Sequence, residues 1–406
     1  MVIPSDQLIE LFAKVSESFS PSAPIDQRAL FAGRLDQIAD VATAISQRGQ
    51  HVVLFGERGV GKTSLATVIS QMYKSNGTNL LSSGSINCDE TTTFSNLWHK
   101  ALREMPVDLG ESRVMGFLPQ PSSPEIGTLA QFLPEDVTPD DIRHIFSRVG
   151  KSIVVIDELD RIEDKRTTKL LADTIKTLSD HSVDCTLVLV GVADSVDNLI
   201  EQHQSVERAL VQIRMPRMNK GELMKIIETG AAKSGLTVQR QASEKIATLS
   251  QGLPHYTHLL ALHSFQAALL RQSLSVELND VSTAIQKALD RAQQSIISAH
   301  HQATNSPKQN LYPQVLLACA MAKTDGLGFF AAGDVREPMS QIMGKAYDIP
   351  AFAQHLKAFC EATRGPILQK SGEPRRYRFR FANPLMQPYV LMDGVRRGLI
   401  TESQIA

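Results

Sequence analysis

The sequence lacks any run of about 18 consecutive apolar residues, so no transmembrane helix is expected among its 406 residues. Close cysteine pairs are also missing, which favours reduced thiols over disulfides or a zinc site. The formal net charge of −1 leaves no global basic excess, so only a local surface could bind nucleic acid. The N-terminus has neither a basic start nor an uninterrupted apolar segment, which predicts no secretory signal and a cytoplasmic protein.

Apolar strands alternate with helices in the first half of the chain. We expect strands at His51–Phe55, Ser82–Asn87, Ser152–Ile156 and Thr186–Val190. Because three of these strands are almost wholly apolar, whereas Ser82–Asn87 is only expected to be extended, the pattern predicts a parallel sheet covered by helices on both faces, which is a doubly wound α/β fold. The Pro-rich segment Pro106–Pro139 interrupts the alternation and is expected to be an insertion or long loop.

Beyond Pro216 the pattern becomes helical, which predicts a helical lid that includes one long helix around Val281–Ala299. The polar run His300–Asn310 is expected to be a hinge. After it, three helices, a strand hairpin and a terminal helix predict a winged helix. At this length two or three domains are expected, and we predict three.

A glycine-rich loop follows the first strand and opens a helix, which is the context that a phosphate-binding loop requires. The loop is Gly56, Glu57, Arg58, Gly59, Val60, Gly61, Lys62 and Thr63, with Ser64 next in the helix. Its backbone N–H groups can converge on phosphate oxygens, Lys62 can reach the β- and γ-phosphates, and Thr63 can ligate Mg²⁺. The alternative is a glycine-rich turn with an incidental lysine. The loop predicts that ATP and Mg²⁺ bind.

Two carboxylates end the strand that begins at Ser152. Asp157 is the candidate for Mg²⁺ coordination, and Glu158 is the candidate for polarising the attacking water. Alternate strand residues point in different directions, so one acid can hold metal while the other works on water. The alternative is that adjacent acids simply end a strand and cap a helix.

These motifs resemble the AAA+ ATPases, and within them the initiator clade of archaeal and eukaryotic origin-recognition proteins. The resemblance rests on Phe31-Ala32-Gly33-Arg34, Asp157-Glu158-Leu159-Asp160-Arg161 and Ser205-Val206-Glu207-Arg208. It implies that Gly33 and Arg34 lie on the adenine side, and that Arg208 is an arginine finger acting in a neighbouring subunit of a homo-oligomer. Arg214 and Arg217 are other candidates for that role. The alternative for Arg208 is an ordinary solvated charge with no part in catalysis.

The resemblance implies four segments: an N-terminal helix and linker over residues 1–30, an AAA+ core over 31–216, a lid over 217–305, and a winged helix over 306–406. Two positions depart from the family pattern. Asp194 falls where the first sensor is more often asparagine, and His255 falls where the second sensor is usually arginine. A neutral imidazole does not replace a guanidinium charge, so we expect slow hydrolysis. The alternative for His255 is lid packing.

The predicted wing carries a local basic excess: residues 364–397 hold eight basic residues and two acidic ones. In its second strand Arg376, Arg378 and Arg380 alternate with aromatic residues, which puts the arginines on one face. A cationic face suits a phosphate backbone, and the resemblance to initiators implies DNA binding. Winged helices also serve as protein-interaction modules.

The combined prediction is an ATPase that uses nucleotide-dependent assembly to act on DNA or a DNA-bound partner. The alternative is a slowly hydrolysing STAND-like switch that recruits a protein effector through its C-terminal segment. The expected partners are ATP or ADP, DNA, and further copies of the chain or another protein, with no membrane.

Overall fold

A computed structural model of the chain describes residues 3–21, 34–75, 82–108, 126–192, 204–306, 310–373, 376–401 and 404–405. The described residues fall into two compact units. Unit 1 takes its residues from Met1–Gly33, Glu57–Gly61 and Pro216–Ala406, and unit 2 takes them from Arg34–Gly56 and Lys62–Met215.

Unit 2 is built on a five-stranded sheet in the order β2-β5-β6-β1-β7, and its strands are all parallel. The bounds are β1 His51–Phe55, β2 Ser82–Asn87, β5 Ser152–Asp157, β6 Cys185–Gly191 and β7 Leu210–Arg214. The inner strands β1, β5 and β6 are almost wholly buried along their length, as strands covered on both faces must be.

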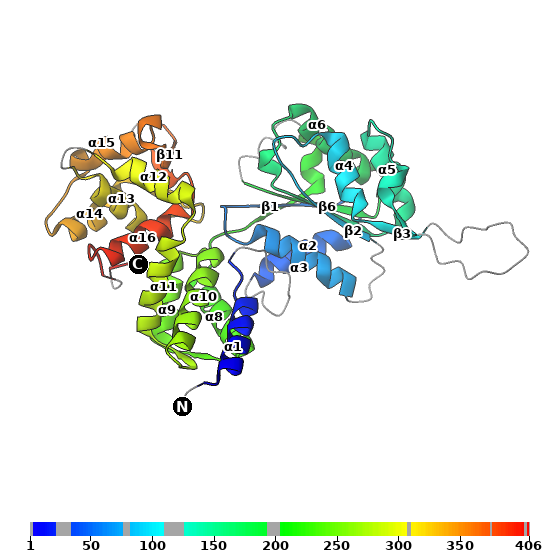
Figure 1. Cartoon of the computed structure of the whole chain (residues 1–406). Coiled ribbons are helices and arrows are strands. Elements are labelled where there is room, and N and C mark those ends of the chain that lie inside the picture. Colours follow the sequence, from blue (N-terminus) through cyan, green and yellow to red (C-terminus); the bar gives the residue numbers. More distant parts are fainter. Residues whose placement is uncertain are drawn as a thin grey trace, which may run out of the picture. The chain divides into compact units, whose positions relative to one another are not determined.

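Helices cover both faces of this sheet (Figure 1), which confirms the predicted doubly wound α/β fold. Two helices lie on one face: α2 Leu35–Ser46 and α3 Lys62–Ser75. Three lie on the other: α4 Phe94–Arg103, α5 Pro139–Val149 and α6 Lys165–Asp180. Short 3₁₀ turns occupy connections: η2 Leu129–Phe132, η3 Leu159–Arg161 and η4 Gln204–Ala209.

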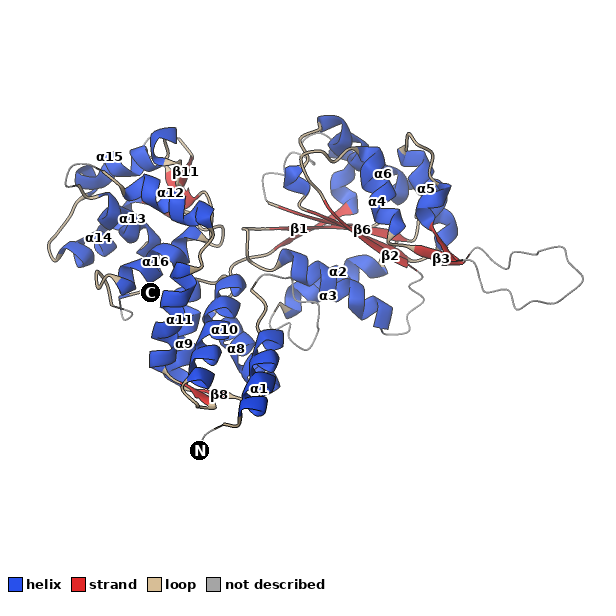
Figure 2. Cartoon of the chain, in the orientation of Figure 1, coloured by secondary structure: helices blue, strands red, loops and turns tan. Residues whose placement is uncertain are grey.

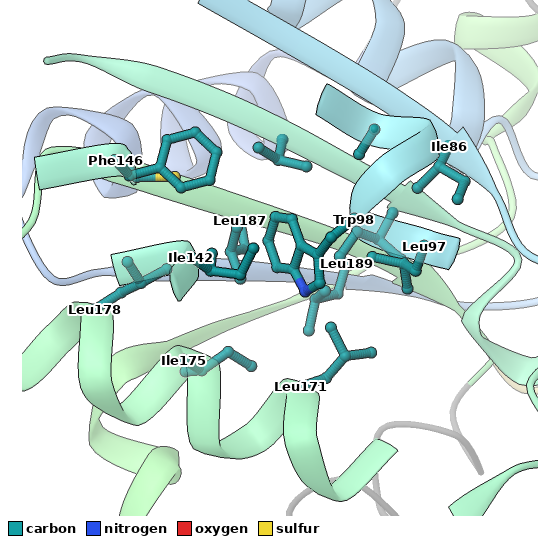
Figure 3. Close-up of a cluster of buried hydrophobic side chains, with 14 of the residues drawn as sticks. Ile86, Leu97, Trp98, Ile142, Phe146, Leu171, Ile175, Leu178, Leu187 and Leu189 are labelled. Atoms are coloured by element: carbon teal, nitrogen blue, oxygen red, sulfur yellow. The ribbon is translucent and has the colours of Figure 1, made fainter. Parts of the chain in front are cut away.

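The core beneath α4 is organised around Trp98, which is fully buried. Figure 3 shows the indole among side chains from the sheet and from α5 and α6, including Phe146 and Leu171. Trp98 meets Phe146 edge to face with ring centroids 6.1 Å apart, a favoured aromatic geometry. The same cluster includes Ile156 and Leu159, which flank the two acids at the end of β5.

The interruption expected over Pro106–Pro139 holds more regular structure than a surface loop. An antiparallel pair joins β3 Pro106–Asp108 to β4 Ile126–Thr128, and residues 109–125 lie outside the described chain. Helix α5 was not predicted. Its start is defined by Pro139 in the first turn and by a capping box in which Thr138 and Asp141 satisfy each other's backbone N–H groups.

Unit 1 contains the helices that follow Pro216 together with α1 Ser5–Ser18. The lid helices are α8 Lys220–Ser234, α9 Arg240–Ser250, α10 Pro254–Leu270 and α11 Leu278–Asp290, and a small parallel sheet joins β8 Thr237–Val238 to β9 Ser275–Val276. Phe19 follows α1 and packs against Phe265 of α10, with ring centroids 4.8 Å apart. Helix α1, whose partner the sequence does not indicate, therefore belongs to the lid.

The long helix predicted around Val281–Ala299 is wrong, because the chain forms two helices there. Helix α11 ends at Asp290, and α12 Gln294–Thr304 begins after a short break. Helix α11 packs mainly on α10, whereas α12 packs on α13, and both helices also contact α16. Helix α12 also occupies part of the run His300–Asn310 that was expected to be a hinge.

The C-terminal segment holds the predicted three helices, hairpin and terminal helix (Figure 2). The helices are α13 Tyr312–Met321, α14 Arg336–Met343, α15 Ile349–Phe359 and α16 Met386–Arg396. The 3₁₀ turn η5 Ala332–Val335 precedes α14, and the 3₁₀ turn η6 Ala362–Arg364 follows α15. The hairpin pairs β11 Leu368–Ser371 with β12 Arg378–Phe381, and β10 Phe330–Ala331 adds a third antiparallel strand that was not predicted. In β12, Phe379 and Phe381 are buried, which confirms the predicted alternation over these four residues.

None of the helices described here is long and apolar enough to cross a membrane.

Candidate nucleotide site

The phosphate-loop sequence starts where β1 ends, at Gly56. A Cβ at this position would lie 2.4 Å from the backbone oxygen of Met215, which follows β7. The Met215 N–H also donates to the Phe55 carbonyl at 2.7 Å, so the backbone of the chain after β7 lies directly against the loop entrance. Only glycine fits there, which gives the first glycine of the motif a packing reason.

Lys62 and Thr63 form the first turn of α3, at the end of the loop. The Lys62 ammonium donates to the Gly56 carbonyl at 3.0 Å, so its side chain folds back over the start of the loop. A helix N-terminus presents backbone N–H groups and a partial positive charge, and both favour a bound anion. Ser64, the next residue, is half-buried in the same turn.

The Thr63 hydroxyl donates to Oδ2 of Asp157 at 2.5 Å, which brings the residues expected at the Mg²⁺ site together. Oδ1 of Asp157 accepts the backbone N–H of Glu158 at 2.7 Å. Burial raises the pKa of Asp157, whereas Thr63, the Glu158 N–H and the Lys62 charge act to lower it. The hydroxyl and the buried carboxylate lie side by side, and both are hard oxygen donors of the kind that bind Mg²⁺.

Glu158 follows Asp157 in the left-handed region, with φ 56°. Such a backbone conformation costs a non-glycine residue about 1 kcal/mol or more, and it occurs disproportionately at functional sites. The carboxylate is 43% exposed and pairs with Arg161 at 3.2 Å. It is therefore accessible to solvent beside a buried acid, as the proposed water-polarising role requires.

The other predicted residues of unit 2 are less completely placed. Arg34 is buried, has φ 63° and stands at the N-cap of α2, while Gly33 lies outside the described residues. Asp194 also lies outside them. Arg208 is 80% exposed in η4, and its guanidinium pairs with Asp180 of α6 at 3.2 Å.

The middle of the loop, Glu57 to Gly61, belongs to unit 1 together with His255. The His255 ring donates from Nδ1 to the Pro21 carbonyl at 2.8 Å. Burial lowers the pKa of His255 and the Arg58 charge adds to the effect, although the bond to Pro21 opposes them. The imidazole is thus neutral at pH 7, and its Cβ stands 4.0 Å from the position a Gly59 Cβ would take.

Sequence reasoning missed a partner of the loop. Arg217 donates from Nε to Glu57 at 2.5 Å, with 12% and 6% of the two side chains exposed. This pairing buries Arg217 within its own chain, so Arg217 does not have the exposed guanidinium that an arginine finger needs. The pairing of Arg217 with Glu57 could not be predicted from residue spacing, because the two residues are 160 positions apart in the sequence.

The three wing arginines differ in their surroundings. Arg378 pairs with Asp325 at 2.9 Å, and Arg380 lies over the Phe329 ring at 4.8 Å from its centroid. Arg376 is exposed before β12 begins. The arginine-bearing side of the hairpin therefore includes two side chains that already contact the loop before β10.

Comparisons with known proteins give similar solved structures and a matching family model. It resembles the ORC2 protein of Aeropyrum pernix, with 15% identity, a TM-score of 0.51, and coverage of 92% of this chain and 98% of that one. It also resembles a Walker-type ATPase of Pyrococcus abyssi, with 15% identity, a TM-score of 0.54, and coverage of 91% and 98%. No curated protein sequence matches.

At that identity the likeness to solved structures shows the fold alone, and the fold is the AAA+ fold that the motifs predicted. The family model described as Novel STAND NTPase 1 matches residues 23–341, which is most of the chain. The protein therefore belongs to the Novel STAND NTPase 1 family of P-loop NTPases.

Proposed function

We propose that this protein binds Mg²⁺-ATP at the loop from Gly56 to Thr63 and acts as a slowly hydrolysing nucleotide switch. The observation that carries the proposal is the Thr63 to Asp157 hydrogen bond of 2.5 Å, which joins the loop's last residue to the end of β5. An incidental glycine-rich turn would have no reason to meet a buried carboxylate from a strand two positions away in the sheet.

Four residues of the first turn of α3 and the end of β5 have chemical roles in the proposal. Lys62 neutralises phosphate charge, Thr63 and Asp157 hold the metal, and Glu158 orients the attacking water. Magnesium, when bound, would neutralise charge that develops on the phosphate oxygens. Most of the assistance in phosphoryl transfer comes from positioning and charge, so these four side chains account for binding and a basal rate.

Slow turnover follows from the surroundings of His255. The ring donates to the Pro21 carbonyl and is kept neutral by burial, so it brings no permanent positive charge to a phosphate. Arg208 is exposed on η4, where it can serve a neighbouring copy rather than its own nucleotide. Hydrolysis would therefore wait for assembly, as suits a switch that holds its nucleotide.

The test is a turnover and binding measurement on the full chain. We expect micromolar or tighter ATP binding that requires Mg²⁺, loss of that binding in Lys62→Ala, and a rate of about 10⁻² s⁻¹ or slower in dilute protein. A fast, concentration-independent rate would contradict the switch. Equal binding by Lys62→Ala would contradict the site itself.

DNA is the second candidate target, and one observation favours it. Arg376 is exposed beside a hairpin whose other face is packed by Phe379 and Phe381. The order α13, β10, α14, α15, β11, β12 is compatible with a winged helix and supports this proposal, since a basic wing can contact phosphates. A mobility-shift titration of duplex DNA with and without ATP separates this target from a protein effector, which is the outcome if no shift occurs at physiological salt.

A further inference from the structure

Glu57 and Arg217 form a buried ion pair inside unit 1. The guanidinium donates from Nε to Oε2 of Glu57 at 2.5 Å and from Nη2 to Oε1 at 3.2 Å, which makes the contact bidentate. Bidentate arginine–carboxylate pairs are directional as well as strong, so this pair fixes where the Glu57 side chain lies. Glu57 is the second residue of the phosphate loop, and Arg217 stands between β7 and α8.

The pair is also tied to the C-terminal segment. The Nη1 of Arg217 donates to Oε1 of Gln387 at 2.6 Å and to the Gln251 carbonyl at 3.2 Å. Gln387 lies in α16, and its amide donates to the Ala320 carbonyl at 2.8 Å at the end of α13. One guanidinium therefore joins the loop, the lid and the C-terminal segment.

Two glycines and a leucine lie close to the pair and to the loop. Gly328, with φ 76°, comes near enough to Glu57 that a Cβ there would meet Oε1, so a larger residue at 328 would displace the carboxylate. A Cβ on Gly59 would lie 3.2 Å from the Leu385 side chain, and the Leu385 carbonyl accepts the Tyr256 hydroxyl at 2.7 Å. The Glu57 carboxylate and the loop tip are thus enclosed by residues from two distant parts of the chain.

A carboxylate in this loop conflicts with the loop's task. The loop is expected to hold the triphosphate, which carries several negative charges, and a buried carboxylate without a cation would repel it. Arg217 neutralises that charge through its two hydrogen bonds to the carboxylate.

We propose that Arg217 is a positioning residue that acts on the phosphate loop through Glu57, whose negative charge it neutralises, and that it couples the loop to the C-terminal segment through Gln387. The proposal rests on nucleotide binding at the loop, as proposed above. It predicts that the two partners of one ion pair respond in opposite directions, because only the loss of the cation leaves a repelling charge.

The test measures ATP affinity and melting temperature in full-length variants. Arg217→Gln should weaken ATP binding by about tenfold or more, within the usual range of coupling between sites. Glu57→Gln should bind ATP more tightly than the unmodified protein, because it removes a negative charge from the loop. The double variant Glu57→Gln with Arg217→Gln should recover affinity to within about threefold, because the repelling charge is gone.

A purely structural pair would give a different pattern. Losing either partner would then lower the melting temperature and the ATP affinity alike, and the double variant would show no recovery; either result overturns the proposal. Arg240→Gln, which removes an exposed pair with Glu244, is the matched control and should change nothing. If Arg217→Gln does not fold, the ATP affinities of Glu57→Gln and of the double variant still show whether removing the Glu57 charge strengthens or weakens binding.

Lys62→Ala separates this proposal from the proposed function. If Lys62→Ala binds ATP as well as the unmodified protein, the site assignment fails and the positioning role fails with it. If Lys62→Ala loses binding while Arg217→Gln and Glu57→Gln both match the unmodified protein, only the positioning role fails.

The variant Gln387→Ala tests the proposed coupling between the phosphate loop and the C-terminal segment. In the unmodified protein, ATP should alter amide hydrogen exchange in α16, and the variant should lose that response while it binds ATP to within about threefold of normal. An α16 response that survives the substitution contradicts the connection through Gln387.

Discussion

Thr63 and Asp157 meet at 2.5 Å although they follow strands that are not neighbours, since β6 lies between β1 and β5 in the sheet. The carboxyl ends of parallel strands share one edge, and the loop that follows β1 passes along that edge to reach α3. The topology of the sheet thus brings the hydroxyl and the carboxylate together. Four predictions follow from this arrangement and from the charges around it.

Replacing Glu158 by glutamine should leave ATP affinity within about threefold and reduce turnover by about 10²- to 10⁴-fold, because the amide keeps the shape but not the basic oxygen. Affinity and single-turnover rate should be measured together. Glu163→Gln, an exposed acid five residues further on, is the control and should turn over normally. Unchanged hydrolysis in the Glu158 variant would remove Glu158 from the mechanism.

Asp157→Asn should weaken Mg²⁺-dependent ATP binding by about 10- to 100-fold and should raise the stability of the nucleotide-free protein at pH 7. Burial raises the pKa of Asp157, so its ionised form costs stability at neutral pH. Below its unfolded pKa the acid is neutral in both states and the cost disappears.

The stability difference between the Asp157 variant and the unmodified protein should therefore shrink as pH falls from 7 to about 4. Urea unfolding of both proteins at the two pH values measures it. A difference that grows on acidification would mean that the carboxylate stabilises the fold, contrary to the burial that surrounds it.

Arg208→Ala should abolish any rise of specific activity with protein concentration, because a finger supplied by a neighbour completes the site only on assembly. The stimulation that is lost could reach about 10³-fold. Asp180→Asn is the matched control, since it breaks the same exposed ion pair but keeps the guanidinium. If both variants behave alike, or if activity never depends on concentration, Arg208 is a surface charge.

Wing variants should change the salt dependence of DNA binding in opposite directions. Arg376→Ala should flatten the slope of log affinity against log salt by about 0.9, and loss of Arg376, Arg378 and Arg380 together by up to about 2.7. Asp325→Asn should steepen the slope, because it frees Arg378 from the pair at 2.9 Å.

The control for the wing is Glu228→Gln, which removes an exposed acid from a pair with Lys225 in the lid and should leave the slope unchanged. A duplex affinity series over salt gives all the slopes. Identical slopes for the unmodified protein, Arg376→Ala and Asp325→Asn would assign the C-terminal segment to protein recognition.

Several elements could be predicted from sequence because their causes are local. The strands at His51–Phe55 and Ser152–Asp157 each contain a continuous apolar run, and the loop after Phe55 carries its own glycines. The split of Val281–Ala299 into two helices could not be predicted, because it depends on which partner each half packs against. Helix α5 begins with a capping box at Thr138, a pattern that is visible in the sequence. It was missed because Thr138 and Pro139 were assigned to the Pro-rich loop.

The sequence by itself determined the phosphate loop, the two acids at the end of β5 and the α/β alternation, since each depends on residue type and short-range spacing. Only the tertiary structure decided that Asp157 meets Thr63, that His255 bonds to Pro21, and that Arg217 neutralises Glu57. The physical reason is distance along the chain. A hydrogen bond or ion pair between residues tens to hundreds of positions apart leaves no periodic trace, because it exists only once packing has brought the two backbones together.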